Sequence, residues 1–336
     1  MQFNPIILTP SSAITAIMPT VTKLCSKLAK HQVSCPKCGF APRLPAPVRK
    51  RKNTMRIACL LCILSMLHAI LSTSIQTNAQ ETKSANPEPF AILAWNIEIG
   101  GSEIATIKEQ LKELEPFEIL ALSEVPKKSV NEFANLWSQD SFIVGEKGGE
   151  ACLLLAWDTT KFDKIKFDEL TKFEDQEFTP GIQAAPLIAQ LRHKQSKMEF
   201  NVVMNHLARG SAELRKRQAL ILVEWAKKQS LPIIAVGGYN FDYDIPTKKG
   251  NEAFDAFLNG GTWKWIEPQQ LIDTNWADRN RDGKDDYPDS MLDFAFAAGP
   301  ARTWGIQSEI IVRDRDFPDT EKTSDQRPIR TTVIHW

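Results

Sequence analysis

The stretch IIAVGGYNFDYD, residues 233–244, joins a buried strand to a cluster of polar side chains. Its first four residues are apolar, which is typical of a strand inside a protein core. A Gly-Gly pair then permits an abrupt turn, and Tyr239, Asn240, Asp242 and Asp244 follow directly. Rigid scaffolds display functional groups where their strands end, so the stretch predicts an α/β fold with a site beside this strand.

Apolar segments of strand length recur along the chain. We expect strands in FAILAWNIEI (90–99), FEILALSEV (117–125), ACLLLAWD (151–158), MLDFAFAAG (291–299) and RPIRTTVIHW (327–336), and a hairpin from PLIAQLRH to MEFNVVMNHL (186–207). Ser102 and Ser211 are expected to open two helices, and residues 159–181 to form a charged, loop-rich stretch. Hairpins mixed with strand-helix-strand units favour a two-layered sheet sandwich with flanking helices over a purely parallel sheet.

The first 80 residues differ in charge from the rest of the chain. They contain ten Lys or Arg and no Asp or Glu, whereas residues 81–336 contain 31 basic and 41 acidic side chains. This acidic balance is unlike that of a strongly basic nucleic-acid-binding surface. We expect a leader at 1–54 that reflects a mis-assigned start, a signal peptide at 55–79, a linker at 80–89 and one folded domain at 90–336.

The segment from Met55 carries the signal-peptide pattern. A basic end at Arg56 precedes an apolar run from Ile57 to about Leu71, and small residues follow. A single membrane anchor is the alternative reading, but the run is shorter than the roughly 20 apolar residues of a spanning helix. The segment therefore favours a secreted or periplasmic protein that keeps no membrane span after cleavage. For residues 1–54 the alternative is an organelle-targeting leader, which is typically free of acidic residues.

Polar side chains collect where the expected strands end. They are Asn96 and Glu98, Glu124, Asn205 and His206, Asn240, and Asp325 in TSDQRP. Taken singly, each has an ordinary structural explanation, such as a turn cap or a solvated carboxylate. Their recurrence at the same kind of position indicates a shared site.

Six phrases carry these residues in order. They read AWNIEIGG, ILALSEV, VVMNHLARG, GGYNFDYD, SMLDFAFAAG and SDQRPIRTTV, and they span most of the chain from Phe90 to Trp336. Together they resemble the endonuclease/exonuclease/phosphatase superfamily of metal-dependent phosphoesterases. The resemblance implies a DNase I-like fold, a four-layer α/β/β/α sandwich. It also implies a monomer that hydrolyses phosphodiester or phosphomonoester bonds in nucleic acid or in a small phosphorylated molecule.

The resemblance assigns roles to individual residues. The implied metal ligands are Asn96, Glu124 and Asp325, the implied catalytic residues are His206, Asn240, Asp293 and Asp325, and the implied substrate-binding residues are Asn205 and Gln326. Such hard oxygen ligands suit Mg²⁺ or Mn²⁺ rather than Zn²⁺. We expect His206 to donate to a phosphate oxygen and Asn240 to hold the attacking water or the phosphate.

Two positions depart from the family pattern. Gly238 stands where the family has an Asp that orients water, and Gln326 stands where it has a phosphate-facing His. Asp242 and Asp244 follow closely enough to be candidate replacements for the lost carboxylate. Gln326 can donate a hydrogen bond but cannot transfer a proton. The sequence therefore leaves open a catalytically impaired member that serves as a phosphate- or nucleic-acid-binding module.

A second constellation lies in DRNRDGKDDYPD, residues 278–289. Asp278, Asn280, Asp282, Asp286 and Asp289 fall at positions 1, 3, 5, 9 and 12 of the calcium-loop pattern, with Gly283 at position 6. The alternative is an acidic, solvated loop. Because no flanking pair of helices can be read from the sequence, we expect a structural Ca²⁺ rather than an EF-hand.

Overall fold

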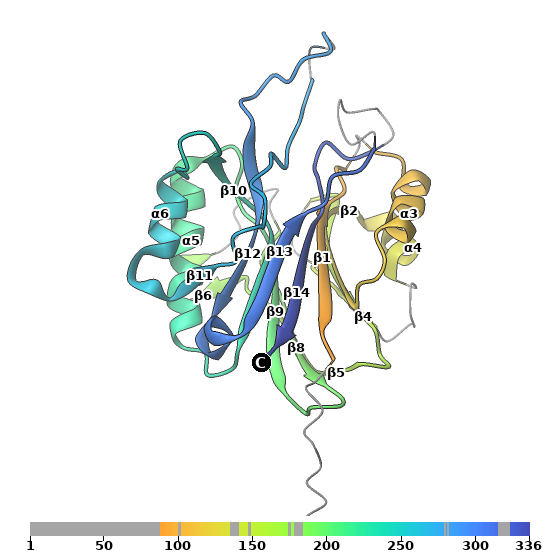
Figure 1. Ribbon diagram of the computed structural model, residues 1–336, viewed down its shortest axis with the longest axis vertical. Helices are drawn as coiled ribbons and strands as arrows, with labels where there is room; N and C mark the ends of the chain where they lie inside the picture. Colours follow the sequence, from red (N-terminus) through yellow and green to blue (C-terminus); the bar gives the residue numbers. More distant parts are fainter. Residues whose placement is uncertain are drawn as a thin grey trace, which may run out of the picture. The chain divides into compact units, whose positions relative to one another are not determined.

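Two six-stranded sheets form the centre of the part of the chain that the computed structural model describes (Figure 1). In spatial order, the first contains β13 (Gly305–Ile310), β14 (Ile329–His335), β1 (Phe90–Asn96), β2 (Ile119–Pro126), β4 (Ala151–Trp157) and β3 (Phe142–Val144). The second contains β11 (Trp263–Trp265), β12 (Ser290–Ala298), β10 (Ile233–Asp244), β9 (Glu199–His206), β8 (Leu187–His193) and β5 (Phe162–Glu169). A short pair, β6 (Lys172–Phe173) and β7 (Gln176–Glu177), stands apart from both. The helices are α3 (Ile104–Glu113), α4 (Val130–Ala134), α5 (Ala212–Lys227) and α6 (Glu252–Leu258), with 3-10 turns η1 (Lys127–Ser129), η2 (Asn259–Gly261) and η3 (Gly299–Thr303).

The structure describes residues 88–99, 102–134, 141–146, 149–173, 176–177, 184–278, 280, 282–314 and 323–336. All of them belong to one folded unit, Thr82–Trp336. The expected leader (1–54) and signal peptide (55–79) lie outside the described residues, as does most of the expected linker. None of the helices within the described ranges is long and apolar enough to cross a membrane.

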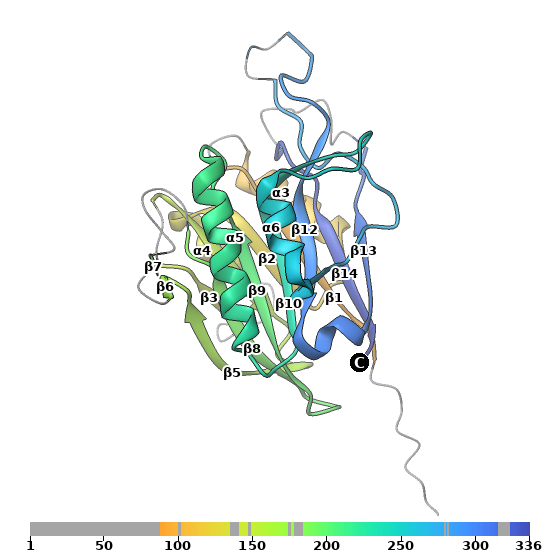
Figure 2. The ribbon, with the colours of Figure 1, turned by 90° about the vertical axis from the view of Figure 1, so that its left-hand side faces the viewer.

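Alternating side chains of the central strands fill three apolar layers. On β1, Ile92 points into the core between the sheets, whereas Leu93 and Trp95 belong to the outer layer with Ile107 and Leu111 of α3. Helices α3 and α4 cover the outer face of the first sheet, and α5 and α6 cover that of the second (Figures 1 and 2). Each fully buried large apolar side chain contributes about 1.5–3 kcal/mol. The predicted four-layer α/β/β/α sandwich is confirmed.

The stretch expected to be loop-rich, residues 159–181, contains a strand. β5 has the sequence FDKIKFDE and pairs with β8 in the antiparallel sense. It lies at the edge of the second sheet, and most of its side chains are exposed. Charged side chains are common on edge strands because they discourage further strand pairing. The charged residues that suggested a loop therefore belong to a strand at the edge of the second sheet.

The two expected helix starts differ in their capping. Ser211 caps α5 as expected, because its hydroxyl accepts a hydrogen bond from the Leu214 amide at 3.2 Å. The N-cap of α3 is Glu103 rather than Ser102, and it makes no side-chain capping bond. Ser102 instead donates its hydroxyl to the Ile97 carbonyl, which ties the start of α3 to the end of β1.

Two strand-helix-strand units bring strand ends together. β1 pairs with β2, and β9 with β10, in the parallel sense, so the carboxyl ends of each pair lie at the same edge. In β10 the register with β12 shifts between Gly238 and Tyr243. Asn240 and Asp242 in this irregular segment have φ of 52° and 44°, in the left-handed region. The polar cluster of residues 233–244 thus lies on a distorted strand end and not in a separate loop.

Only one glycine of the Gly-Gly pair is required by the backbone. Gly237 has a φ of 117°, and a Cβ there would lie 2.4 Å from the Asn205 carbonyl oxygen. Gly238 has no such conformation and pairs regularly with His206 on one side and Asp293 on the other. The backbone conformation therefore does not explain the glycine at 238, whose neighbours His206 and Asp293 are predicted site residues.

Candidate active site

A pocket of about 150 Å³ collects five of the eight residues predicted for the phosphoesterase site. Its lining contains Glu124, His206, Leu207, Arg209, Asn240, Asn275, Ala277, Tyr287, Leu292, Asp325 and Gln326. Glu124 comes from β2, His206 ends β9, and Asn240 lies on the irregular part of β10. Strand ends from both sheets therefore contribute to one hollow, as the recurrence of polar residues indicated.

The carboxylate of Glu124 is held from two sides. Asn96 donates from Nδ2 to Glu124 Oε1 at 2.9 Å, and the Ile99 amide donates to Oε2 at 3.2 Å. Glu124 itself has a φ of 58°, a conformation that costs roughly 1 kcal/mol or more for a residue other than glycine. Asn96 Oδ1 accepts from the Glu98 amide at 3.0 Å. Asn96 thus orients Glu124 from beside the pocket and is not one of its lining residues.

Asp325 reaches the pocket from the segment before β14. Its amide donates to the Glu98 carboxylate at 3.0 Å, and its carbonyl accepts from the Trp276 amide at 2.9 Å. The neighbouring Ser324 hydroxyl donates to the Asn96 carbonyl at 2.6 Å. These bonds fasten the segment of Asp325 to the end of β1, so the three predicted metal ligands lie in one region.

The oxygen ligands available here fit a hard divalent cation. Mg²⁺ is usually held by one or two carboxylates and keeps several of its waters, and Glu124 and Asp325 line the same pocket. Within the described ranges, no group of three or more His, Cys, Asp or Glu side chains is arranged to hold a metal ion. The two carboxylates of the pocket fit the few protein ligands that Mg²⁺ or Mn²⁺ needs.

His206 lies beside Glu124 and over Gly238. Its Nε2 atom is 3.5 Å from Glu124 Oε1. Burial lowers the pKa of His206 below its usual value, and the charge of Glu124 partly opposes this shift. A Cβ at residue 238 would lie 3.0 Å from His206 Cδ2, which is tighter than ordinary contact. The imidazole ring thus lies against space that a side chain at 238 would need.

Asp293, a predicted catalytic residue, is a buried acid on the other side of Gly238 from His206. It is 3% exposed and does not line the pocket. Its Oδ2 atom is buried without a hydrogen-bond partner among the described residues. Burial raises the pKa of Asp293 to about 7, although a hydrogen bond from Thr274 opposes the shift. The protein thus holds a carboxyl group that titrates near neutral pH.

The remaining predicted residues divide into two groups. Asn240 lines the pocket and donates from Nδ2 to the Leu207 carbonyl at 2.8 Å. Gln326 also lines the pocket, and its backbone carbonyl accepts from the Trp95 indole at 2.7 Å. Asn205, expected to bind substrate, is fully buried and donates to the Tyr239 hydroxyl at 2.9 Å. The structure does not bring Asn205 to the pocket, because β9 turns its side chain into the core.

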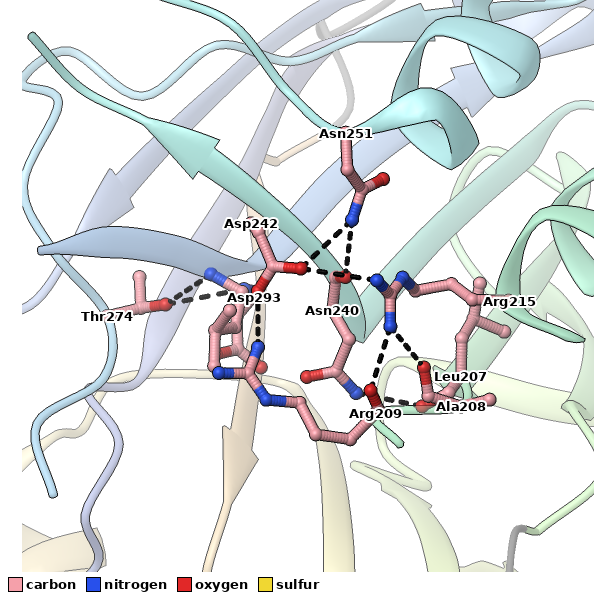
Figure 3. A network of polar contacts seen from close by, with 10 residues as sticks. Leu207, Ala208, Arg209, Arg215, Asn240, Asp242, Asn251, Thr274 and Asp293 are labelled. Atoms are coloured by element: carbon pink, nitrogen blue, oxygen red, sulfur yellow. Dashed lines mark hydrogen bonds and ion pairs between the residues drawn. The ribbon is translucent and has the colours of Figure 1, made fainter. Parts of the chain in front are cut away.

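Neither candidate replacement for the carboxylate at 238 faces the pocket. Asp242 pairs with Arg209 and Arg215, and it accepts a hydrogen bond from Asn251 at 3.0 Å (Figure 3). Asp244 accepts from the backbone amide of Thr247 at 2.7 Å, within an exposed turn. Both carboxylates thus have structural partners.

The predicted calcium loop is stabilised by its own side chains. Asp278 accepts from the amides of Asp282 and Gly283 at 2.9 and 2.7 Å, and Asn280 donates to Asp286 at 2.7 Å. These are bonds within an acidic turn, and Ca²⁺ binding there stays a prediction.

Three polar side chains of the pocket were not predicted from the sequence. They are Arg209, Asn275 and Tyr287. Arg209 follows His206 by three residues, in the phrase VVMNHLARG, so its position beside a strand end was a usable signal. Asn275 and Tyr287 come from the long connection before β12, whose path the sequence does not reveal.

No family model and no curated protein matches the chain. Among solved structures, an endonuclease/exonuclease/phosphatase family protein from Bacteroides thetaiotaomicron is 16% identical with a TM-score of 0.56, and the match covers 74% of this chain and 98% of that chain. A mannosyl-6-phosphatase from the same organism is 15% identical, with a TM-score of 0.54 and coverages of 73% and 99%. TDP2 from D. rerio, solved with a single-strand DNA product, is 15% identical, with a TM-score of 0.56 and coverages of 73% and 98%.

The chain has the endonuclease/exonuclease/phosphatase fold. The resemblance seen in the six sequence phrases is confirmed at this level. In this chain the endonuclease/exonuclease/phosphatase fold carries the pocket where β2 and β9 end and where β10 becomes irregular. The two sequence departures, Gly238 and Gln326, lie against the His206 ring and in the pocket lining.

Proposed function

We propose that the protein is a metal-dependent phosphoesterase that hydrolyses phosphodiester or phosphomonoester bonds. The observation that carries this proposal is the convergence of Glu124, Asp325, His206 and Asn240 on one pocket from separate strands and a loop. The carboxylates of Glu124 and Asp325 can bind a hard cation, and His206 and Asn240 can donate hydrogen bonds to phosphate oxygens. A fold shared with hydrolases of phosphoesters agrees with the proposal.

The roles of the residues follow from their chemistry. Mg²⁺ or Mn²⁺ held by Glu124 and Asp325 would supply Lewis-acid stabilisation of phosphate charge. Asn96 keeps the Glu124 carboxylate oriented toward the pocket through its 2.9 Å hydrogen bond. His206 and Asn240 supply N–H donors to phosphate oxygens or to a water. Gln326 adds a neutral donor where the family has a titratable group.

A second candidate function is phosphate binding without turnover. Gly238 provides no carboxylate to polarise water, and Asp242 and Asp244 are bonded to other partners. General acid–base help contributes roughly 10²- to 10⁴-fold to rate, so its loss leaves a slow enzyme or a binding module. The missing carboxylate at 238 and the bonded states of Asp242 and Asp244 are the observations that support binding without turnover. The hydrolysis experiment below separates this candidate from the phosphoesterase.

We also propose that the protein is secreted or periplasmic, and the signal-peptide pattern from Met55 supports this proposal. The solved neighbours include a mannosyl-6-phosphatase and a protein with bound single-strand DNA product. A small phosphorylated molecule and a nucleic acid are therefore both proposed substrate classes. The excess of acidic residues after residue 80 disfavours tight binding to duplex DNA, which depends on Lys and Arg contacts to phosphate.

The test is hydrolysis of plasmid DNA, a bis-aryl phosphate and an aryl phosphate in the presence of Mg²⁺ or Mn²⁺. Glu124→Ala should abolish any activity that belongs to the pocket. Glu224→Ala, an exposed acid paired with Lys227 on α5, is the matched control and should retain it. Equal, near-zero rates for the native protein and Glu124→Ala on all three substrates would favour the binding module.

A further inference from the structure

Arg209 occupies a position that the proposed function leaves unassigned. It lies in the loop after β9, lines the pocket, and its side chain is 41% exposed. Its guanidinium carbon lies 5.8 Å from the centre of the Tyr287 ring, and its Nη1 atom pairs with Asp242. The side chain is thus reachable by a ligand yet supported by two neighbours.

A buried arginine holds this arrangement in place. Arg215 on α5 is 6% exposed, and its Nη1 atom donates to the carbonyls of Ala208 and Arg209 at 2.8 and 2.9 Å (Figure 3). Its Nη2 atom donates to Asp242 Oδ2 at 3.3 Å. Arg215 therefore fixes both the backbone from which Arg209 extends and the carboxylate with which Arg209 pairs.

The charges of this group do not cancel. One carboxylate, Asp242, is shared by two guanidinium groups, so the three side chains together carry one net positive charge. Asn251 donates to the same carboxylate at 3.0 Å and adds no charge. Because Arg215 is buried, the exposed share of this charge is presented by Arg209.

A positive charge in the pocket would favour the binding of an anion such as phosphate. Glu124 and Asp325 carry two negative charges, which a divalent cation would only neutralise. Gln326 and Asn240 are neutral donors. Among the described residues that line the pocket, Arg209 is the one with a permanent positive charge.

We propose that Arg209 is a phosphate-binding residue of this pocket, held ready by Asp242, Arg215 and Tyr287. The proposal rests on the proposed function only in that the ligand carries a phosphate group. A guanidinium has five N–H donors, and the pair with Asp242 leaves several of them for phosphate oxygens. Asp242 is then the orienting partner of a phosphate ligand and not a substitute for the carboxylate missing at 238.

The test is binding of inorganic phosphate to the Mg²⁺-loaded protein by calorimetry. Arg209→Gln should weaken the phosphate Kd by about 10- to 100-fold, the usual range for a lost charge-assisted hydrogen bond. Arg209→Lys should recover part of the affinity, because it restores the charge without the planar fork. The control Arg217→Gln, on the surface of α5, should bind as the native protein does. Mg²⁺ affinity should stay within about threefold in all variants.

Two results would overturn the proposal. One is a phosphate Kd for Arg209→Gln within twofold of the native value, and the other is a native protein that does not bind phosphate at all. A melting temperature equal to that of the native protein shows that a variant remains folded. If Arg209→Gln does not fold, Arg209→Lys still tests the proposal. Phosphate binding that depends on Arg209 without turnover would support this proposal and contradict the esterase. Phosphoester hydrolysis together with phosphate binding that does not depend on Arg209 would support the esterase and contradict this proposal.

Discussion

Replacing Asp293 by Asn should stabilise the protein more at high pH than at low pH. The carboxyl group is 3% exposed, and burial raises its pKa from 3.8 to about 7. A group whose pKa is higher in the folded state keeps its proton longer there, so stability falls as pH rises between the unfolded and folded values. Native stability is therefore expected to decline from about pH 4 to about pH 7.

The size of the effect follows from the shift. Three pKa units correspond to about 4 kcal/mol over the full range, at about 1.4 kcal/mol per unit. Roughly 2 to 3 kcal/mol of this falls between pH 5 and pH 8.5. Asn has a similar shape and does not ionise, so Asp293→Asn should escape this loss. Its advantage over the native protein should grow by about 2 to 3 kcal/mol across that interval.

The assay is urea unfolding in chelator at pH 5 and pH 8.5, followed by tryptophan fluorescence. Asp163→Asn, at an exposed ion pair with Lys194, is the matched control, and the free energy difference should stay below about 1 kcal/mol at both pH values. If the difference in unfolding free energy between Asp293→Asn and the native protein is the same at both pH values, Asp293 does not titrate between them and the prediction is wrong.

Three further predictions concern other parts of the structure. Gly238→Asp should lower the free energy of unfolding by about 2 kcal/mol or more, because its Cβ would lie 3.0 Å from His206 Cδ2 and 3.5 Å from Asp293 Oδ1; an unchanged urea midpoint would contradict this. Ser211→Ala should remove the capping bond of α5 and cost about 1 kcal/mol, or roughly 2–4 °C in Tm; a Tm within error of native would argue against that cap. Adding Ca²⁺ to chelator-treated protein should raise the Tm, and Asp278→Ala should abolish the rise; an unchanged native Tm would count against the calcium loop.

The sequence predicted the fold well where periodicity and burial agree. The strands of residues 90–96, 119–126 and 233–244 are buried on both faces because each lies between a helix layer and the other sheet. The prediction of a loop-rich stretch was wrong at β5, because a strand at the edge of a sheet can carry charged side chains. Strand position within a sheet is a tertiary property that local composition does not encode.

The candidate site was predictable where its residues follow strands directly. Glu124 and His206 were predicted from their positions at strand ends, and the structure places His206 Nε2 3.5 Å from Glu124 Oε1. The partners of Asp242 were not predictable, because Arg209 and Arg215 precede it by 33 and 27 residues and meet it only through packing of α5. Asn205 shows the opposite limit, since adjacency to His206 gave no sign that its side chain points into the core.

We propose that Glu124 and Asp325 support divalent-metal phosphoester hydrolysis in this pocket. The most direct measurement is the initial rate of bis-aryl phosphate hydrolysis as a function of Mg²⁺ concentration, for the native protein and Glu124→Ala side by side. We expect a rate that saturates with Mg²⁺ in the native protein and that is absent in Glu124→Ala. A native rate that persists in chelator, or that Glu124→Ala retains, would show that the hydrolysis does not depend on a metal held in this pocket.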